Sequence, residues 1–191
     1  NDRTQESLLR MLSMSGENKD LRNSLFPLNI SPVTISYEYD PCDGLKAFEL
    51  WTKASGKKYV KTPQDDLKNM VTGISGKKGR VNFHFSKSIN EQLIACTETD
   101  TRKQSATIAE IIDDVIFSNY MLFDTHKTAY NLLTGTETFE IPGQKAAEIK
   151  NYFNNQLNSV GLSENEMNFI LIQYANPVIN HFELKKKKAD K

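Results

Sequence analysis

The sequence has neither a long apolar run nor an excess of charge of one sign, and each absence excludes a class of protein. Its 191 residues include 24 Lys and Arg and 24 Asp and Glu, so the formal net charge is zero. We therefore do not expect nucleic-acid binding through a general basic field. The apolar runs are only a few residues long, whereas a membrane-spanning helix needs about 20. We predict no membrane span and identify no signal peptide.

Cysteine and histidine are also scarce, with two and three residues. Cys42 and Cys96 lie far apart, and the histidines at 84, 126 and 181 do not stand at metal-ligand spacings. We expect two free thiols in a reducing compartment and no metal site.

The clearest secondary-structure signal is a strand that begins at Val33. Val33, Ile35, Tyr37 and Tyr39 alternate with polar residues, and this period of two is typical of a strand with one buried face. We expect the apolar face to be buried and the polar face to present hydroxyls and two carboxylates. Pro32 should start the strand, and Asp40-Pro41 should end it.

A second strand and several helices are indicated around it. Residues 81–85 alternate in the same way, after a turn at 76–79. The apolar spacing predicts a helix with Leu8, Leu9 and Leu12, capped by Asp2 and stopped at Gly16. Further helices are expected around Leu21, after Asp43, from Thr62-Pro63, over 105–120, 125–134 and 143–158, and from Ser163 to about Asn176, where Pro177 breaks or kinks the last one. We expect Lys185–Lys188 to be disordered.

Three stretches of the chain carry a resemblance to a known family. The segment Ile30–Cys42 reads Ile-x-Pro-Val-x-Ile-Ser-Tyr-Glu-Tyr-Asp-Pro-Cys. It resembles the fourth sequence block of the glycerol-3-phosphate and 1-acylglycerol-3-phosphate acyltransferases. Asn1–Ser7 resembles the segment that follows the family's Glu-Gly-x-Arg block, and Gly79–Ile89 resembles a later strand. The similarity covers roughly residues 1–120, and more loosely the rest.

The resemblance implies an α/β fold, α+β within this chain. Residues 1–120 would be the C-terminal half of an acyltransferase-type mixed sheet flanked by helices. Residues 121–184 would form an all-helical extension, and 185–191 a basic tail. The chain would be part of a longer enzyme of phospholipid synthesis, which moves a fatty acyl group from a thioester to glycerol-3-phosphate or its 1-acyl form.

The family's catalytic pattern, a His with an Asp five residues later, does not occur in this chain. The residues at that distance from the three histidines are Ile89, Asn131 and Lys186. The hydroxyl that attacks a thioester needs a base, and in the family this His takes the role, oriented by the Asp. We therefore assign no catalytic residue here and expect the chain alone to be inactive.

The residues left as candidates for substrate binding are few. Carried over from the family, Pro32 and Val33 would shape the acyl-donor or acceptor site. Lys77, Lys78 and Arg80 flank glycines, where their charges and the backbone N–H groups can meet a phosphate. Simpler interpretations stay open, namely a core strand for the first pair and a solvated loop for the three cations.

The resemblance also implies the partners of the enzyme. The donor would be acyl-coenzyme A or an acyl carrier protein, with no other cofactor. The acceptor would be a glycerol-phosphate lipid, met on the cytoplasmic side of the inner membrane by peripheral contact.

A different class of function remains open, a non-catalytic helical module that docks an acyl carrier protein or an anionic membrane. It would use the basic loops, including Lys57, Lys58 and Lys61, and the terminal lysines. A small hydrolase is a weaker alternative, because the sequence contains no Gly-x-Ser-x-Gly nucleophile elbow.

Overall fold

The computed structural model describes residues 3–14 and 20–189. They are mostly helical, with a small two-stranded sheet, so the α+β class is confirmed at this coarse level. The chain divides into two compact units, each built from separate stretches of sequence. Unit 1 contains residues 1–35, 83–120 and 183–191, and unit 2 contains residues 36–82 and 121–182.

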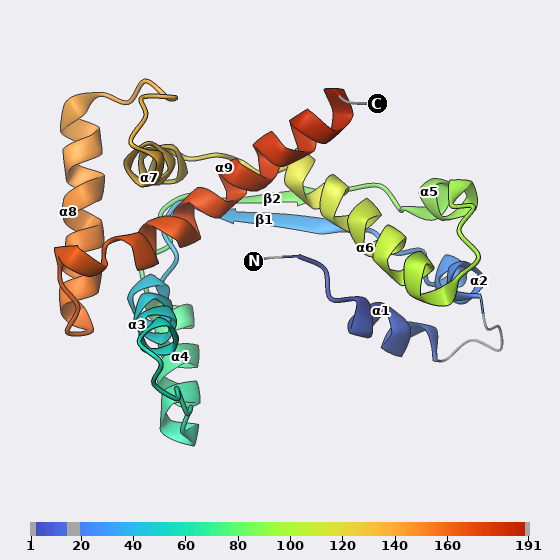
Figure 1. The fold of residues 1–191 in the computed structure, drawn as a ribbon, viewed down its shortest axis with the longest axis horizontal. Coiled ribbons are helices and arrows are strands. Elements are labelled where there is room, and N and C mark those ends of the chain that lie inside the picture. Colours follow the sequence, from blue (N-terminus) through green and yellow to red (C-terminus); the bar gives the residue numbers. More distant parts are fainter. Residues whose placement is uncertain (1–2, 15–19, 190–191) are drawn as a thin grey trace. The chain divides into compact units, whose positions relative to one another are not determined.

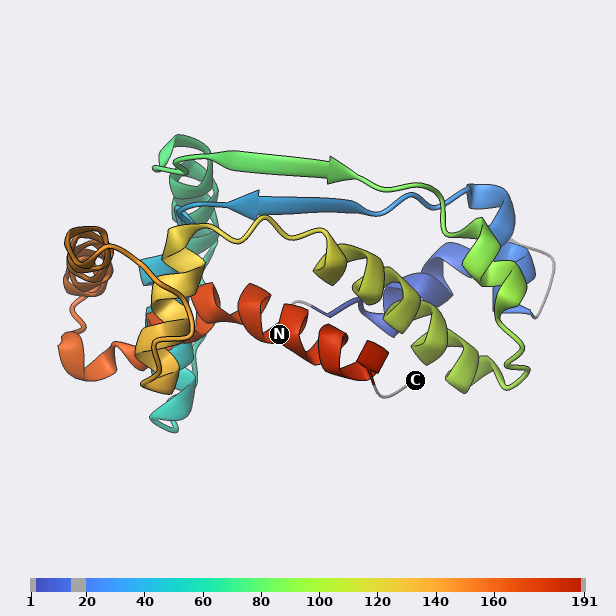
Figure 2. The same cartoon turned by 90° about the horizontal axis from the view of Figure 1, so that it is seen from above.

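The sheet pairs β1 (Val33–Tyr37) with β2 (Val81–Phe85), as the sequence predicts. The strands lie side by side and run in opposite directions (Figures 1 and 2). Hydrogen bonds from Ser86 N to Pro32 O and from Glu38 N to Arg80 O fix the register. This register places Ile35 opposite Phe83, at a pair without mutual hydrogen bonds, where facing side chains come closest.

The predicted orientation of β1 is wrong, because its polar face is the buried one. Thr34 and Ser36 are 1% and 3% exposed, whereas Val33 and Ile35 are 40% and 43% exposed. The buried hydroxyls have partners: Thr34 Oγ1 donates to the Ile116 carbonyl, and Ser36 Oγ accepts from the Met121 N–H. Because these bonds satisfy the polar face, it tolerates burial. The prediction holds only for Tyr39, after the strand, which is 8% exposed.

Unit 1 is built around α6 (Thr101–Ser118), with α1 (Glu6–Ser13) and α2 (Leu21–Leu25) packed against it. A short 3-10 helix (Phe26–Leu28) follows α2, and α5 (Asn90–Ala95) follows β2. The buried core consists of Leu9, Leu21, Leu25, Ile89, Leu93, Ile108, Ala109 and Ile112. The predicted cap at Asp2 and stop at Gly16 lie outside the described residues.

A buried glutamine ties the start of α6 to the start of α2. Gln104 is 1% exposed; its side chain accepts from the Leu21 N–H at 2.8 Å and donates to the Glu98 carbonyl at 2.9 Å. Asp100 caps α6 by accepting from two backbone N–H groups of its first turn. The helix therefore begins at Thr101, four residues before the predicted start.

Unit 2 contains α3 (Asp43–Ala54), α4 (Pro63–Ser75), α7 (Asp124–Thr134) and α8 (Gly143–Ser159). α8 packs against α3 and α7. The buried core consists of Ala47, Ala129, Ile149, Phe153, Leu157, Leu162, Met167, Ile170, Leu171, Tyr174 and Ala175. Gly44 permits the approach of α3 to α8, since an added Cβ would lie 2.8 Å from the Gln156 carbonyl oxygen.

Local signals set the helix ends of unit 2. The predicted start of α4 is confirmed: Thr62 caps the helix, Asp65 completes a capping box, and Pro63 is the first helical residue. The predicted stop of α7 is also confirmed, at Gly135 with φ of 67°.

The last helix differs from its prediction. A 3-10 turn (Glu164–Glu166) with the expected Ser163 cap leads into α9 (Asn168–Ala189), which continues through Pro177. The neighbours of Pro177 explain this, because Tyr174, Ala175 and Val178 are all buried. Their burial offsets the lost backbone hydrogen bond. The residues Lys185–Lys188, expected to be disordered, are helical, and Lys187 pairs with Glu110 at 2.9 Å.

Among the described residues, no helix is both long enough and apolar enough to cross a membrane.

Two leucines of unit 2 separate core packing from surface exposure. Leu157 is completely buried and Leu67 is 57% exposed. We expect Leu157→Ala to lower the free energy of unfolding by about 2–5 kcal/mol, through lost burial and a cavity. Leu67→Ala should change it by no more than about 0.5 kcal/mol. Urea unfolding followed by the fluorescence of Trp51, in the same unit, measures both, and equal losses would contradict this packing.

Candidate functional site

The five predicted substrate-binding residues lie in different units. Pro32 and Val33 belong to unit 1, and Lys77, Lys78 and Arg80 belong to unit 2. Pro32 is buried and its carbonyl accepts from the Ser86 N–H at 3.0 Å. Val33 points to the exposed apolar face of β1. The two groups are not brought together within one unit, and their roles in binding remain predictions.

Lys77 and Lys78 make contacts within unit 2. The Lys77 ammonium lies over the Tyr39 ring at 4.1 Å and the Tyr152 ring at 5.5 Å. Lys78 donates to the Ile74 and Gly76 carbonyls, at the end of α4. Both lysines therefore make structural contacts at the surface. Lys77 forms a cation–π contact, and Lys78 donates hydrogen bonds to carbonyl groups at the end of a helix.

Arg80 forms a bidentate ion pair with Glu38. Its Nε and Nη2 donate to the carboxylate at 3.2 and 3.1 Å, and the Arg80 backbone N–H adds a third bond at 3.0 Å. These bonds lower the pKa of Glu38. Because Glu38 neutralises the guanidinium, Arg80 is a weaker candidate for a phosphate than its place beside a glycine predicts.

One acid of unit 2 has a strongly raised pKa, and sequence reasoning does not single it out. Asp43, at the start of α3, is completely buried. Its carboxylate accepts from the Tyr174 hydroxyl at 2.7 Å, the Tyr152 hydroxyl at 2.9 Å and the Gly44 N–H at 2.6 Å. Burial raises the pKa of Asp43 to about 6, against the opposing effect of these hydrogen bonds.

This acid–tyrosine cluster holds unit 2 together from three helices. Tyr152 is on α8 and Tyr174 on α9, and Tyr174 also accepts from the Asp40 N–H at 2.8 Å. Burial raises the pKa of both tyrosines, so both remain protonated donors. In the sequence Asp43 looks like an ordinary helix-start acid, because its partners are more than 100 residues away.

The structure removes His126 as a candidate base. Its ring is 5% exposed, and Nδ1 accepts from the Phe123 N–H at 3.1 Å. Nδ1 is therefore already occupied, and the burial of the ring keeps a substrate hydroxyl away from it. Burial lowers the pKa of His126 to about 4, so the ring is neutral near pH 7.

His84 is exposed and lines a cavity of unit 1, about 610 Å³ in volume. The cavity lies between the end of β2, α5, α6 and the last turn of α9. The side chains that give it a polar lining include His84, Ser86, Lys87, Ser88, Asn119 and Lys188. Ser86 Oγ is buried and has no hydrogen-bond partner among the described residues.

The cavity combines cations, hydroxyls and one acid. Lys87 and Lys188 carry positive charge, and Asp114 is the one carboxylate of its lining. No hydrogen bond joins Asp114 to His84 in the part of the chain that the structure describes, so the pair is not a formed His–Asp base. The arrangement suits an anion, for example a phosphate, better than it suits proton abstraction.

Within residues 3–14 and 20–189, no cluster of His, Cys, Asp or Glu could hold a metal ion. Both cysteines are free, and burial raises the pKa of the Cys42 thiol. Comparison with known proteins gives no matching family model, curated protein or solved structure. The assignment of function therefore depends on the residues themselves.

The pH dependence of stability tests the two buried titratable groups of unit 2. Asp43 binds a proton more tightly when folded, which lowers stability as pH rises from 4 to 6. His126 binds one less tightly when folded, which raises stability over a similar range. Each contribution is roughly 3 kcal/mol, so we expect them nearly to cancel in the wild type.

Removing the titration of Asp43 should make the pH dependence that His126 contributes to stability measurable. Asp43→Asn keeps an acceptor for the tyrosine hydroxyls but removes the titration, so its unfolding free energy should rise by roughly 3 kcal/mol between pH 4 and 6.5. Urea unfolding at several pH values measures this, with Glu148→Asn at the exposed surface of α8 as the control. A variant profile parallel to the wild type would show that Asp43 keeps its ordinary pKa.

Proposed function

We propose that this chain is the C-terminal part of an acyltransferase of glycerolipid synthesis. The full enzyme would move a fatty acyl group from coenzyme A or an acyl carrier protein to glycerol-3-phosphate or its 1-acyl form. In this proposal the two strands belong to a larger mixed sheet, and residues 121–184 extend the domain. The catalytic His and Asp would come from a segment outside this chain.

The uncovered apolar face of the strand pair is the observation that carries the proposal. Val33, Ile35 and Tyr37 of β1, and Val81, Phe83 and Phe85 of β2, are all between 37% and 74% exposed. On the opposite face, the Thr34 and Ser36 hydroxyls of β1 are buried and hydrogen-bonded. A two-stranded sheet with a bare apolar face is marginal in water, so a further layer is expected to cover it.

One residue that the resemblance assigns to substrate binding lies on this apolar face. Val33 projects from it, opposite Phe85, and Phe85 also lines the cationic cavity of unit 1. An acyl chain against Val33 and a phosphate at Lys87 and Lys188 would thus bind neighbouring surfaces of one unit. Pro32 would hold the strand start, through its carbonyl bond to Ser86.

The chemistry assigned to the missing segment is general base catalysis. The base takes the proton of the acceptor hydroxyl as its oxygen attacks the thioester carbonyl, and the thiol departs from the tetrahedral intermediate. His126 cannot serve, because it is buried and its Nδ1 already accepts the Phe123 N–H. His84 lacks a hydrogen-bonded carboxylate among the described residues.

The test compares acyl transfer by the longer enzyme and by this chain, with a labelled acyl thioester and glycerol-3-phosphate. We expect activity only in the longer enzyme. In it, Phe85→Asp should lower kcat/KM at least about tenfold, by placing a charge in the covered interface. Ile94→Asp, at a residue of unit 1 with similar exposure, 72% against 74%, is the control. A fully active short chain, or equal effects of both substitutions, would contradict the proposal.

The docking module remains a second candidate because of one feature of unit 2. The helix α4 turns its apolar side outward, with Leu67, Met70, Val71 and Ile74 at least 54% exposed. Its other side faces the unit through Asn69 and Gly73, which approach the Cys42 sulfur. Several lysines lie within this helix or close to it in the sequence, at 57, 58, 61, 68, 77 and 78.

Vesicle binding separates this candidate from the enzyme proposal. A docking module predicts salt-sensitive binding of this chain to anionic vesicles, because Lys–lipid attraction is screened by salt. Ile74→Asp, and separately neutralisation of Lys77, Lys78 and Lys185–Lys188, should weaken it at least about fivefold. Ile94→Asp serves as the control. Binding that ignores salt and all of these changes would reject the docking module.

A further inference from the structure

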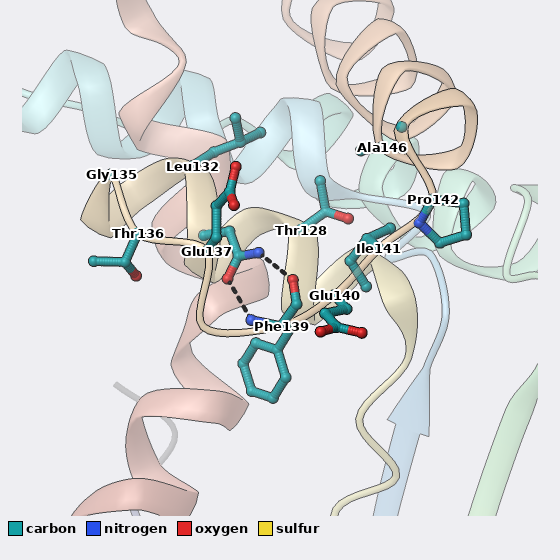
Figure 3. A pocket seen from close by; sticks show the side chains of 12 residues that line it. Thr128, Leu132, Gly135, Thr136, Glu137, Phe139, Glu140, Ile141, Pro142 and Ala146 are labelled. Atoms are coloured by element: carbon teal, nitrogen blue, oxygen red, sulfur yellow. Dashed lines mark hydrogen bonds between the residues drawn. The ribbon is translucent and has the colours of Figure 1, made fainter.

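A second cavity lies in unit 2, and its lining shares no residue with the surfaces that the acyltransferase proposal uses. Its volume is about 910 Å³, within the range of small-molecule sites. It is formed by the second half of α7, the loop 135–142 and the first turn of α8. Figure 3 shows these three segments around the cavity.

The loop that forms one wall is held in place. Asn131 on α7 donates from its side-chain amide to the Phe139 carbonyl at 2.8 Å and accepts from the Phe139 N–H at 3.2 Å. The Phe139 ring stacks on Phe182, with centroids 6.0 Å apart and the planes only 3° from parallel. The cavity is therefore preformed, which reduces the entropy that a ligand must overcome.

The N-terminus of α8 opens at the cavity without a cap. Pro142 precedes the helix and has no side chain that can accept a hydrogen bond. The backbone N–H groups of Gly143, Gln144 and Lys145 have no acceptor among the described residues, and the first helical bond runs from Ala146 N to Pro142 O. Such N–H groups, with the helix dipole, attract an anion.

An unpaired hydroxyl provides the second, independent sign of a ligand. Thr128 on α7 lines the cavity and is 3% exposed, and its Oγ1 has no hydrogen-bond partner in the described chain. In Figure 3 this oxygen is turned toward Ile141 and Pro142, beside the start of α8. A threonine in a helix can rotate between two χ1 positions to meet a ligand. Leaving its hydroxyl unpaired destabilises the free protein, and a ligand that accepts from it would relieve that cost.

The charges at the cavity define what kind of anion fits. Glu137 and Glu140 both line it, whereas no lysine or arginine among the described residues does. A simple anion would be repelled by the two carboxylates. A small molecule with both an anionic group and an ammonium group would match both the free N–H groups of α8 and the two carboxylates of the lining.

We propose that this cavity binds a small zwitterion, with its carboxylate or phosphate at the α8 N-terminus and Thr128, and its ammonium beside Glu137 and Glu140. The free source would be an α-amino acid, and the lipid source a phosphoethanolamine headgroup. The apolar lining from Leu132, Ile141 and Pro142 accommodates the carbon atoms between the charges. The site is independent of the acyltransferase proposal, since it shares no residue with that proposal's surfaces.

Calorimetric titration of this chain tests the site with three probes: glycine, phosphoethanolamine and inorganic phosphate. We expect one of the two zwitterions to bind at least tenfold more tightly than phosphate, and the preferred one identifies the source. If neither zwitterion binds, or if phosphate binds equally well, the proposal is wrong.

Matched substitutions place the binding in this cavity. Thr128→Val removes the unpaired hydroxyl at nearly constant volume and should weaken binding at least fivefold. Gly143→Pro deletes one free N–H at a helix position that tolerates proline, while Gly143→Ala adds a methyl group into open space and keeps the N–H. Only the proline variant should weaken binding, and Glu140→Gln should do so more than Glu148→Gln. Circular dichroism confirms folding, and equal affinities across the set would overturn the assignment.

Discussion

The inward-facing hydroxyls of β1 are the constraint on which the rest of unit 1 and the start of unit 2 depend. Thr34 bonds the last turn of α6 and Ser36 bonds the segment that follows it. A strand that hydrogen-bonds its polar face to the chain must present its apolar face elsewhere, because successive side chains alternate. The exposed row from Val33 to Tyr37 is thus a consequence of two hydrogen bonds that are satisfied within the chain.

Unit 2 depends in a similar way on one buried acid. At the start of α3, Asp43 accepts hydrogen bonds from tyrosine hydroxyls of α8 and α9. The apolar core of the unit includes Phe153 and Leu157. Burial raises the energy of the ionised acid, and the hydrogen bonds limit that increase. The unit therefore contains a titrating group in its interior, balanced by the neutral His126 on a neighbouring helix.

The sequence was sufficient to locate most elements, because their signals are local. The alternation at 33–37 and 81–85, the Thr62-Pro63 helix start and the Gly135 stop are all confirmed. Alternation cannot say which face is buried, since that depends on partners such as Ile116, 82 residues away. The helix end expected near Asn176 was wrong, and Pro177 does not break the helix, because burial of its neighbours outweighs the local penalty.

The candidate sites were less accessible to sequence reasoning than the fold. Pro32, Val33, Lys77, Lys78 and Arg80 were chosen by resemblance or by proximity to glycine, and the ion pair of Arg80 with Glu38 was not foreseen. Nothing in the sequence marks Thr128 or Asp43, since each is defined by what surrounds it in space. The sequence shows that Pro142, which has no capping side chain, precedes a helix, but it does not show that the Thr128 hydroxyl lies beside that helix start.

In the proposed acyltransferase, a further layer would cover the apolar face of the strands. Hydroxyl-radical labelling with mass spectrometry measures this directly on Phe83 and Phe85, with the buried Phe153 as an internal reference. We expect rapid oxidation of both residues in this chain and at least about tenfold protection in the proposed longer acyltransferase. Equal oxidation rates in the two polypeptides would contradict it.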